Sequence, residues 1–320
     1  MTFTSFLLFF GIAILMLILF IFATYFIAKL LCDVALNRVA PKFMQNRNNL
    51  LAKITGSDAF VKELFEKEKL LSREQTEQVE IAGHGGVKLK GHLLNAENPK
   101  RIIIAVHGWR GTWSRDFGIV SDFFKKNSTV LYVEQRGQAG SEGDYITFGI
   151  CERYDIIEWI KWVIKRFPHK LPIYLLGISM GASTVLMSTG LGLDGAVHGI
   201  IADSGFTAPE DIWSHVARSN LHLPYVFYKK QARAEYEKRT GYSPSECSTL
   251  EALKSCTTPV LFVHGTDDSF VPVEMTYENY KACHSPKRLF VVPGANHGMS
   301  YFVDKSGYEG EVERFFLEYD

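Results

Sequence analysis

A serine lies between two glycines in the stretch "LLGISMGAS", residues 175–183. The pattern Gly-x-Ser-x-Gly is modest evidence by itself, but the apolar run "PIYLL" precedes it and the helix-like "ASTVLMST" follows it. A sharp turn between a strand and a helix lifts a serine hydroxyl above the sheet, and glycines beside it avoid collisions in the strained backbone. We therefore expect Ser179 to be a nucleophile.

A serine hydroxyl is a poor nucleophile unless a base takes its proton. His297 lies in "VVPGANHGMS", just after the last strand-like run, and is the predicted base. The preceding run, "VLFVHGTDDSFVP", offers Asp267 and Asp268 as candidates for the acid that orients the imidazole. The resulting chain order of serine, aspartate and histidine is the order found in α/β-hydrolases.

Several other histidines have simpler explanations. His107 and His264 each precede a glycine at the end of a strand-like run, where hydrogen bonds that stabilise a turn are favoured over proton transfer. His84 lies in a hairpin turn, while His169 and His284 lie in loops beside prolines. None of these five occupies the place of the base in the chain order.

An acyl-transfer site also needs hydrogen-bond donors for the oxyanion. The stretch "AVHGWRG" ends an earlier strand-like run, and its glycine-flanked turn is expected to aim the backbone N–H of Trp109 inward. The N–H of Met180, at the start of the helix after Ser179, is the expected second donor.

These residues follow short apolar runs that alternate with helix-like segments. The runs "RIIIAVHG", "STVLYVEQRG", "LPIYLLGIS", "VHGIIADSG", "TPVLFVHG" and "KRLFVVPG" have the composition of buried parallel strands. Helices are predicted around residues 116–126 and 150–167, and "EQVEIAGHGGVKLKGHLL" predicts an antiparallel hairpin before them. We predict an α/β fold with a mostly parallel sheet, an N-terminal antiparallel hairpin, helices on both faces and ligands at the carboxyl ends of the strands.

Residues 77–320 are predicted to form this domain, and one segment of it breaks the alternation. Residues 206–257 contain no strand-like run but are rich in aromatic residues, and they directly follow a strand. We interpret this segment as a small helical cap over the site; ordinary scaffold helices are the alternative.

The N-terminal region has a different composition. Residues 3–28 carry no charged side chain and are long enough to cross about 30 Å of hydrocarbon as a helix, so they are predicted to be a single transmembrane anchor. Lys and Arg residues follow this run and none precedes it, which places the catalytic domain in the cytoplasm by the positive-inside rule.

Residues 29–76 are predicted to be a juxtamembrane linker with a short helix over 60–71. Its mixed charge favours packing on the domain over lying on the membrane surface. Cys32 lies where palmitoylation could occur, although a free cysteine is the favoured interpretation.

Composition excludes several classes of protein. Lys plus Arg and Asp plus Glu number 35 each, so there is no overall basic charge that would favour nucleic acid as a partner. The five cysteines are scattered without paired spacing, which argues against a disulfide framework and a zinc site. We expect neither a metal nor an organic cofactor.

From about residue 77 onward, the sequence resembles the α/β-hydrolase superfamily, and more narrowly the acyl-esterase and prolyl-oligopeptidase-like hydrolases. Five blocks of that pattern occur in order: HGxxG at 107–111, a DxRGxGxSxG-like loop at 134–143, GxSxG at 177–181, HGxxDxxVP at 264–272 and GxxH at 294–297. The resemblance implies that Asp268 is the catalytic acid and Asp267 a turn residue. The second block departs from the family, with Glu134 in place of the usual aspartate and Gln138 where histidine is frequent.

The expected function is a membrane-anchored serine hydrolase that cleaves carboxylic esters or thioesters through an acyl-enzyme, with a lipid-like or small acyl substrate. Two alternatives are a serine peptidase of the prolyl-oligopeptidase-like type and a non-catalytic, membrane-tethered binding module.

Overall fold

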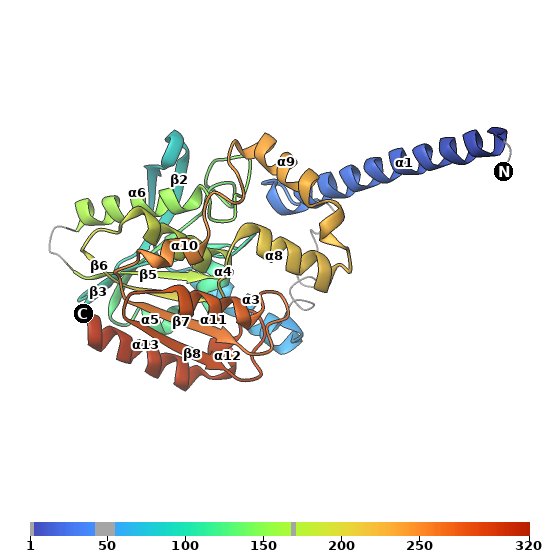
Figure 1. The fold of residues 1–320 in the computed structure, drawn as a ribbon. Helices are drawn as coiled ribbons and strands as arrows, with labels where there is room; N and C mark the ends of the chain where they lie inside the picture. The colour runs from blue at the N-terminus through green and yellow to red at the C-terminus, as the bar shows by residue number, and fades with distance from the viewer. Residues whose placement is uncertain (1–2, 42–54, 168–170) are drawn as a thin grey trace.

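An eight-stranded sheet forms the centre of the molecule in a computed structural model that describes residues 3–41, 55–167 and 171–320 (Figure 1). The strands lie in the order β1-β2-β4-β3-β5-β6-β7-β8. Their bounds are β1 Glu77–Ala82, β2 Lys88–Leu94, β3 Arg101–Val106, β4 Ser128–Val133, β5 Ile173–Ile178, β6 Val197–Asp203, β7 Val260–Gly265 and β8 Lys287–Val292. Strand β2 pairs antiparallel with β1 and β4, and the other neighbours pair parallel. The predicted mostly parallel sheet with an N-terminal hairpin is confirmed.

Helices cover both faces of this sheet, as predicted. Alternate residues of β3 belong to two apolar clusters: Ile103 packs with the helices of one face, and Ile102 and Ile104 with those of the other. The first face is covered by α3 Asp58–Leu71, α4 Trp113–Gly118, α5 Ser121–Phe124, α12 Ser300–Val303 and α13 Lys305–Tyr319. The second is covered by α6 Glu152–Arg166, α7 Met180–Ser188, α10 Thr249–Lys254 and α11 Val273–Ala282.

The helix predicted around residues 116–126 is instead two short helices, α4 and α5. The break follows Gly118, where α3 passes so close that a Cβ would lie 2.7 Å from the carbonyl carbon of Lys67. The interruption therefore occurs where another helix crosses, which local sequence does not encode.

Helix α3 corresponds to the helix predicted over residues 60–71. It begins after Ser57, whose side chain accepts a hydrogen bond from the N–H of Phe60 and so caps the helix. Its buried face, which includes Val61 and Leu64, belongs to the apolar cluster on the first face of the sheet. The preference for packing on the domain is confirmed.

The segment predicted to be a cap contains helices and no strand among its described residues. It comprises α8 Pro209–His215, the π-helical turn η4 Val216–Asn220, the short helix η5 Tyr225–Phe227, α9 Lys229–Thr240 and then α10. Most of its aromatic residues belong to a third apolar cluster, together with Ile146, Phe148, Ile150 and the end of α1.

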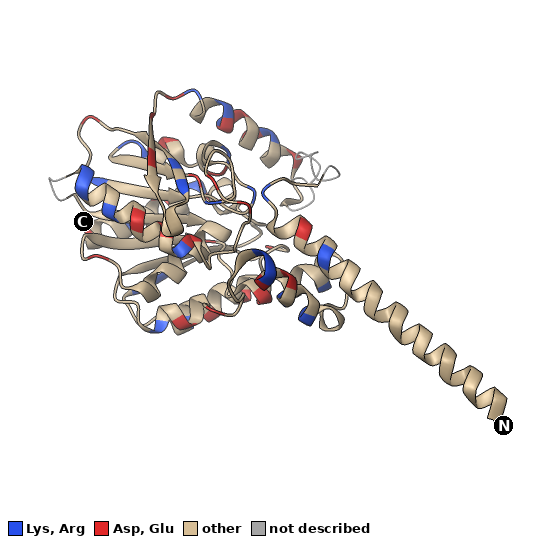
Figure 2. Ribbon diagram, turned by 90° about the horizontal axis from the view of Figure 1, so that it is seen from above, with Lys and Arg blue, Asp and Glu red and all other residues tan. Residues whose placement is uncertain are grey.

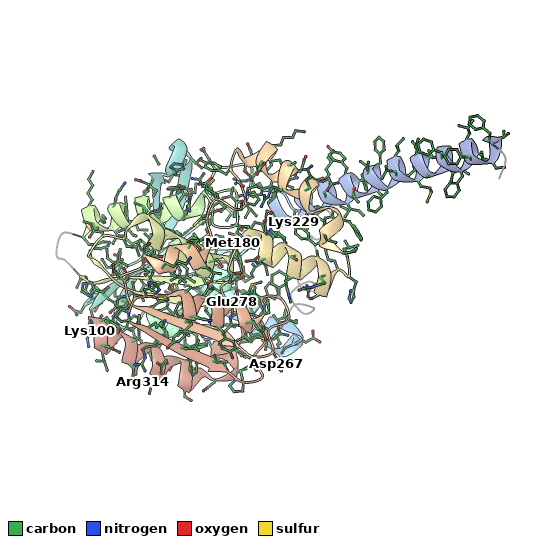
Figure 3. The ribbon with its side chains drawn as sticks, in the orientation of Figure 1. Lys100, Met180, Lys229, Asp267, Glu278 and Arg314 are labelled. Atoms are coloured by element: carbon green, nitrogen blue, oxygen red, sulfur yellow. The ribbon has the colours of Figure 1, made fainter. Side chains whose placement is uncertain are left out.

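Helix α1, Phe3–Leu36, is by length and composition a candidate membrane span, with a mean hydropathy of 3.1 in its most apolar window. Its outer part projects from the domain without charged residues (Figure 2), and its side chains extend on all sides (Figure 3). The helix continues eight residues beyond residue 28, where the predicted anchor ends. The part of the predicted linker at residues 42–54 lies outside the described residues.

The inner end of α1 packs against helix α9 of the predicted cap segment. Thr24, Ala28, Cys32 and Leu36 recur at four-residue spacing and are buried on one face of the helix. The Cys32 thiol contacts the carbonyl oxygen of Ala232 at 3.7 Å. Cys32 is therefore covered by protein and not presented as an exposed juxtamembrane thiol.

Candidate active site

Ser179 occupies the turn between β5 and α7. Its backbone has φ 56° and ψ −120°, a conformation that non-glycine residues rarely adopt. Both neighbouring glycines are required sterically, because a Cβ on Gly177 would collide with the backbone of Gly181, and one on Gly181 with the carbonyl oxygen of Val106. The strained turn is further held by the hydrogen bond from the Ser179 N–H to the carbonyl oxygen of Asp203, at 2.8 Å.

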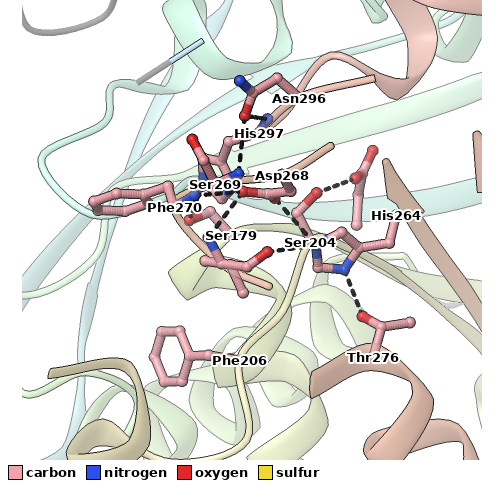
Figure 4. Close-up of polar contacts among 12 residues, drawn as sticks. Ser179, Ser204, Phe206, His264, Asp268, Ser269, Phe270, Thr276, Asn296 and His297 are labelled. Carbon is pink, nitrogen blue, oxygen red and sulfur yellow. Dashed lines mark hydrogen bonds and ion pairs between the residues drawn. The ribbon is translucent and has the colours of Figure 1, made fainter. Parts of the chain in front are cut away.

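Hydrogen bonds link the three residues that were predicted to act together: His297 lies between Ser179 and Asp268 (Figure 4). His297 Nε2 lies 2.9 Å from Ser179 Oγ, and His297 Nδ1 lies 2.7 Å from Asp268 Oδ2. The carboxyl ends of β5, β7 and β8 bring these residues together from positions far apart in the chain. The arrangement is that of a nucleophile, a base within hydrogen-bond reach and an acid that orients the base.

The charges in this chain support proton transfer. Burial disfavours the charged imidazole, but the Asp268 carboxylate outweighs that effect and raises the pKa of His297 above its usual value. Burial likewise raises the pKa of Asp268, yet the charge of His297 and the hydrogen bonds from His264 and His297 hold it well below its usual range. Asp268 is therefore ionised at neutral pH, and its charge favours the protonated form of His297.

His264 contacts the acid directly, which sequence reasoning missed. Its Nε2 lies 3.0 Å from Asp268 Oδ2 and 2.8 Å from the carbonyl oxygen of Val271, while its Nδ1 lies 2.7 Å from Thr276 Oγ1. The backbone N–H groups of Phe270 and Val271 donate to the other carboxylate oxygen, Oδ1. The carboxylate is thus fixed by four donors, including His297. The four-residue spacing in HGxxD was the available signal.

His107 has the structural role that the sequence suggested. Its Nε2 accepts a hydrogen bond from the N–H of Gln135 at 3.2 Å, and its Nδ1 lies 2.8 Å from the carbonyl oxygen of Gly108. Burial lowers its pKa, so the ring is neutral and joins two loops at the edge of the sheet. His297, by contrast, lies within hydrogen-bond distance of Ser179 Oγ.

Asp203 is a second buried carboxyl group near the candidate triad. It ends β6 and accepts a hydrogen bond from Ser204 Oγ at 2.9 Å. Burial raises its pKa to about 6, and its charge contributes to the raised pKa of His297. The sequence contained a signal for Asp203: the strand-like run "IIADSG" ends on this acidic residue, and its carboxyl end was expected at the same edge of the sheet as Ser179.

The two predicted oxyanion donors flank Ser179. A Cβ on Gly108 would lie 3.2 Å from the Cβ of Ser179, so the loop that carries Trp109 approaches the nucleophile directly. Met180 is the first residue of α7, where backbone N–H groups lack helical partners. Within the described part of the chain, neither the Trp109 N–H nor the Met180 N–H donates a backbone hydrogen bond outside helices and strands. Both are available for a ligand.

The loop that carries Trp109 is held from several sides. The N–H of Gly108 donates to Asp116 Oδ2 at 2.8 Å, and the N–H of Arg110 donates to Gln138 Oε1 at 2.6 Å. Arg110 has φ 52°, a left-handed conformation. Gln138, one of the two departures from the family pattern, therefore braces the candidate oxyanion loop.

The same loop also contacts the end of α1. Trp109 Nε1 donates to the carbonyl oxygen of Ala35 at 2.8 Å, and the Arg110 guanidinium donates to those of Val34 and Asn37, each at 2.7 Å. The last carbonyl groups of a helix have no partners within it, and a cation there is also favoured by the helix dipole. The apolar N-terminal helix and the candidate oxyanion loop therefore stabilise each other, a contact that the sequence did not predict.

The other departure from the family pattern, Glu134, is fully accommodated. Its Oε1 lies 2.9 Å from His92 Nε2, and its Oε2 accepts the N–H of Gly140 at 2.6 Å. Burial raises the pKa of Glu134, but the contacts with His92 and Gly140 lower it below its usual value. Glu134 thus has a hydrogen-bond partner on β2, which closes the loop.

Metal-ligating side chains do not gather in the described part of the chain. Among the described residues, no group of three or more His, Cys, Asp or Glu side chains could hold a metal ion. The five cysteines are free thiols, four of them buried.

Comparisons with known proteins agree with this architecture. Residues 97–234 match the family model described as serine aminopeptidase, S33. Over 230 residues the chain is 27% identical to the Bacillus subtilis protein YqkD, covering 72% of this chain and 75% of that protein. Over 251 residues it is 25% identical to YfhR of Escherichia coli K12, covering 75% of this chain and 80% of that protein.

Solved structures show the same fold. The esterase Pf2001 of Pyrococcus furiosus superposes with a TM-score of 0.64 at 25% identity, covering 78% of this chain and 93% of that one. The α/β hydrolase GrgF of Penicillium sp. sh18 gives 0.60 at 18% identity, covering 77% and 99%. Est1E of Butyrivibrio proteoclasticus, solved with ferulic acid bound, gives 0.56 at 19% identity, covering 75% and 98%.

Proposed function

We propose that this chain, which has the α/β-hydrolase fold, is a membrane-anchored serine hydrolase that cleaves carboxylic esters or thioesters. The observation that carries the proposal is the hydrogen-bonded series Ser179, His297 and Asp268 beside two unpaired backbone N–H groups. The likeness to the esterase Pf2001 supports an ester as the substrate.

In the proposed mechanism, Ser179 Oγ attacks the acyl carbon while His297 Nε2 accepts its proton. The N–H groups of Trp109 and Met180 stabilise the oxyanion of the tetrahedral intermediate, and Asp268 stabilises the imidazolium. His297 then returns the proton to the leaving alcohol or thiol, which departs and leaves an acyl-enzyme. Water, deprotonated by His297, hydrolyses that ester and restores Ser179.

A serine peptidase is the second candidate, because the matching family model is described as a serine aminopeptidase. Recognition of a free amino terminus calls for a carboxylate aimed at the substrate. The carboxylates of Asp116, Asp203 and Asp268, which lie near Ser179, already accept hydrogen bonds from protein groups. This occupation favours esters over amino-terminal peptides.

The test is labelling with a fluorophosphonate probe followed by kinetics. Wild-type protein should be labelled, and Ser179→Ala should not, with the equally small change Ser188→Ala on the same helix as a control. Rates on p-nitrophenyl acyl esters should exceed those on aminoacyl anilides. The absence of labelling in folded wild-type protein would instead favour a non-catalytic binding module, and the reverse substrate preference would favour the peptidase.

The anchor and its orientation are part of the proposal. Helix α1 would hold the protein in a bilayer, and the Lys and Arg residues that follow residues 3–28 would keep the catalytic domain in the cytoplasm. Tethering favours a substrate that lies in or near the membrane. Protease accessibility in sealed, oriented vesicles tests this, since protease added on the cytoplasmic side should digest the domain.

A further inference from the structure

A segment of the cap lies beside the part of α1 that carries no charge. The ring of Phe227 contacts the ring of Phe20 edge-on, with 5.7 Å between centroids. Gln231 Nε2 donates to Thr24 Oγ1 at 3.2 Å, which fixes the next turn of the cap against the same helix. Figure 1 shows α9 running along the inner end of α1, and the label of Lys229 in Figure 3 marks this junction.

The position of Phe20 along α1 sets the depth of this contact. A helix needs about 20 residues to cross a hydrocarbon core of about 30 Å. Every 20-residue window within residues 3–28 contains Phe20, wherever the core is centred. If α1 spans a bilayer, Phe227 therefore lies at the level of the hydrocarbon.

The segment at residues 221–227, which we call the cap tip, has the surface that such a position requires. Leu221, Val226 and Phe227 expose 47%, 76% and 55% of their surface. Three large apolar side chains exposed in one short segment are uncommon on a protein surrounded by water.

Half of the six backbone N–H groups of the cap tip are paired within the protein. The N–H groups of Leu221, Leu223 and Phe227 donate to backbone carbonyl groups within the cap, and Pro224 has no N–H. An unpaired N–H group is costly in hydrocarbon, so this pairing lowers the free energy of insertion.

The charges around the cap tip match a membrane surface. Between Asp211 and Glu235 the sequence contains no acidic residue, but it contains the basic residues Arg218, Lys229, Lys230 and Arg233. Lys229 and Arg233 form ion pairs with Glu210, at 3.5 and 2.9 Å, so Arg218 and Lys230 supply the positive charge that is left for a membrane. Apolar residues flanked by cations are typical of segments that insert among lipid headgroups, where anionic lipids attract the cations.

The base of the cap tip reaches the candidate site. Asn220 Nδ2 donates to the carbonyl oxygen of Ser269 at 3.2 Å, and His215 Nε2 lies 3.3 Å from the same oxygen. Ser269 directly follows the acid Asp268. The residues that precede the cap tip therefore contact the loop that carries Asp268.

We propose that the cap tip is a second membrane-binding element, which inserts beside α1 into the lipid leaflet that faces the domain, so that the site takes lipid esters from that leaflet. This inference rests on the proposed function, because it assumes that α1 spans a bilayer and that Ser179 hydrolyses esters. Its partner is a lipid surface, and the cap is the element that contacts it.

Insertion can be measured with an environment-sensitive fluorophore on single cysteines of the full chain. Phe227→Cys reports the cap tip, Phe10→Cys reports the outer part of α1, and Leu317→Cys is an apolar control that is 84% exposed on α13. All three carry Cys247→Ser, because the other native cysteines are buried. The protein is reconstituted into vesicles of phosphatidylcholine and phosphatidylglycerol that contain a lipid with a quencher on its acyl chain.

We expect quenching and a blue shift at positions 10 and 227, and neither at position 317. Quenching at position 10 with position 227 resembling position 317 would overturn the proposal while leaving the anchor intact. The absence of quenching at both positions 10 and 227 would overturn the anchor and this proposal together.

The consequence for substrate supply is tested with Val226→Asp/Phe227→Asp. Two charges in place of the apolar side chains should lower hydrolysis of a lipid ester held in vesicles by about tenfold or more. Hydrolysis of a water-soluble short-chain ester should be unchanged, because neither residue belongs to the triad or the oxyanion loop. Unchanged lipid hydrolysis, or an equal loss on both substrates, would overturn the proposal. If wild-type protein hydrolysed neither ester, the proposed function itself would fail.

Discussion

Changing Trp109 to phenylalanine tests whether helix α1 supports the proposed oxyanion loop. The substitution keeps an aromatic ring but removes the hydrogen bond, 2.8 Å long, from Nε1 to the carbonyl oxygen of Ala35 at the end of α1. The backbone N–H of Trp109, which is the proposed oxyanion donor, remains. Any effect on catalysis must therefore come from the position of the loop or from the smaller ring.

The size of the effect can be bounded. A net hydrogen bond of this kind contributes about 0.5–1.5 kcal/mol, and complete loss of an oxyanion donor costs about 2.7–4 kcal/mol. Because Gln138 and Arg110 still hold the loop, we expect the smaller range to apply. With about 1.4 kcal/mol for each tenfold change in rate, kcat should fall by about two- to tenfold.

The assay is steady-state hydrolysis of a soluble p-nitrophenyl ester by full-length protein in detergent or vesicles. KM should change little, because the proposed contact with the oxyanion strengthens in the transition state. Trp162→Phe on α6 is the matched control, since it makes the same chemical change on a half-buried tryptophan far from the loop. A kcat for Trp109→Phe equal to that of the control would refute the proposed support by α1.

The remaining predictions concern the triad and the turn. The pKa of His297 is raised and the base must be neutral, so kcat/KM should fall as the pH drops through a midpoint above 6.5. Asp268→Asn should move that midpoint to lower pH and reduce kcat/KM at the high-pH plateau about 10³- to 10⁴-fold. A midpoint that does not move would contradict the assignment of Asp268 as the acid. His264→Phe should lower kcat about tenfold and shift the acidic limb of the pH profile, because Asp268 loses a hydrogen-bond donor. Loss of stability with an unchanged pH profile would indicate that His264 has a purely structural role. Gly181→Ala should lower the free energy of unfolding by about 3 kcal/mol or more, because its Cβ would collide with the carbonyl group of Val106. Gly310→Ala on α13, where a Cβ meets no neighbouring atom, should raise the free energy of unfolding by up to about 1 kcal/mol. Similar melting temperatures for the two variants would refute the steric argument.

The sheet and the grouping of the candidate site were predictable because both follow from strand patterns. Apolar runs on both faces indicate buried parallel strands, and parallel strands place their carboxyl ends at one edge. Ser179, Asp268 and His297 each follow such a run, so their proximity followed from topology without any knowledge of side-chain contacts.

The inner end of α1 could not be predicted in the same way. The sequence suggested an end near residue 28 because charged residues begin there, but the helix continues to Leu36. Its last turns are stabilised by tertiary contacts, such as the burial of Leu36 and the ion pair of Asp33 with Arg239 at 2.8 Å. Contacts between residues about two hundred positions apart leave no periodic signal in the local sequence.

The departures from the family pattern and helix α1 belong to one hydrogen-bond network. Glu134 pairs with His92 and closes the loop at residues 134–143, and that loop presents Gln138 to the N–H of Arg110. The guanidinium of Arg110 then binds the last carbonyl groups of α1. Gln138 thus fixes the backbone of Arg110, and the end of α1 fixes its side chain. Arg110 directly follows Trp109, the proposed oxyanion donor. The two residues that depart from the family pattern therefore help to hold the loop that binds the end of α1 next to the carboxyl edge of the sheet.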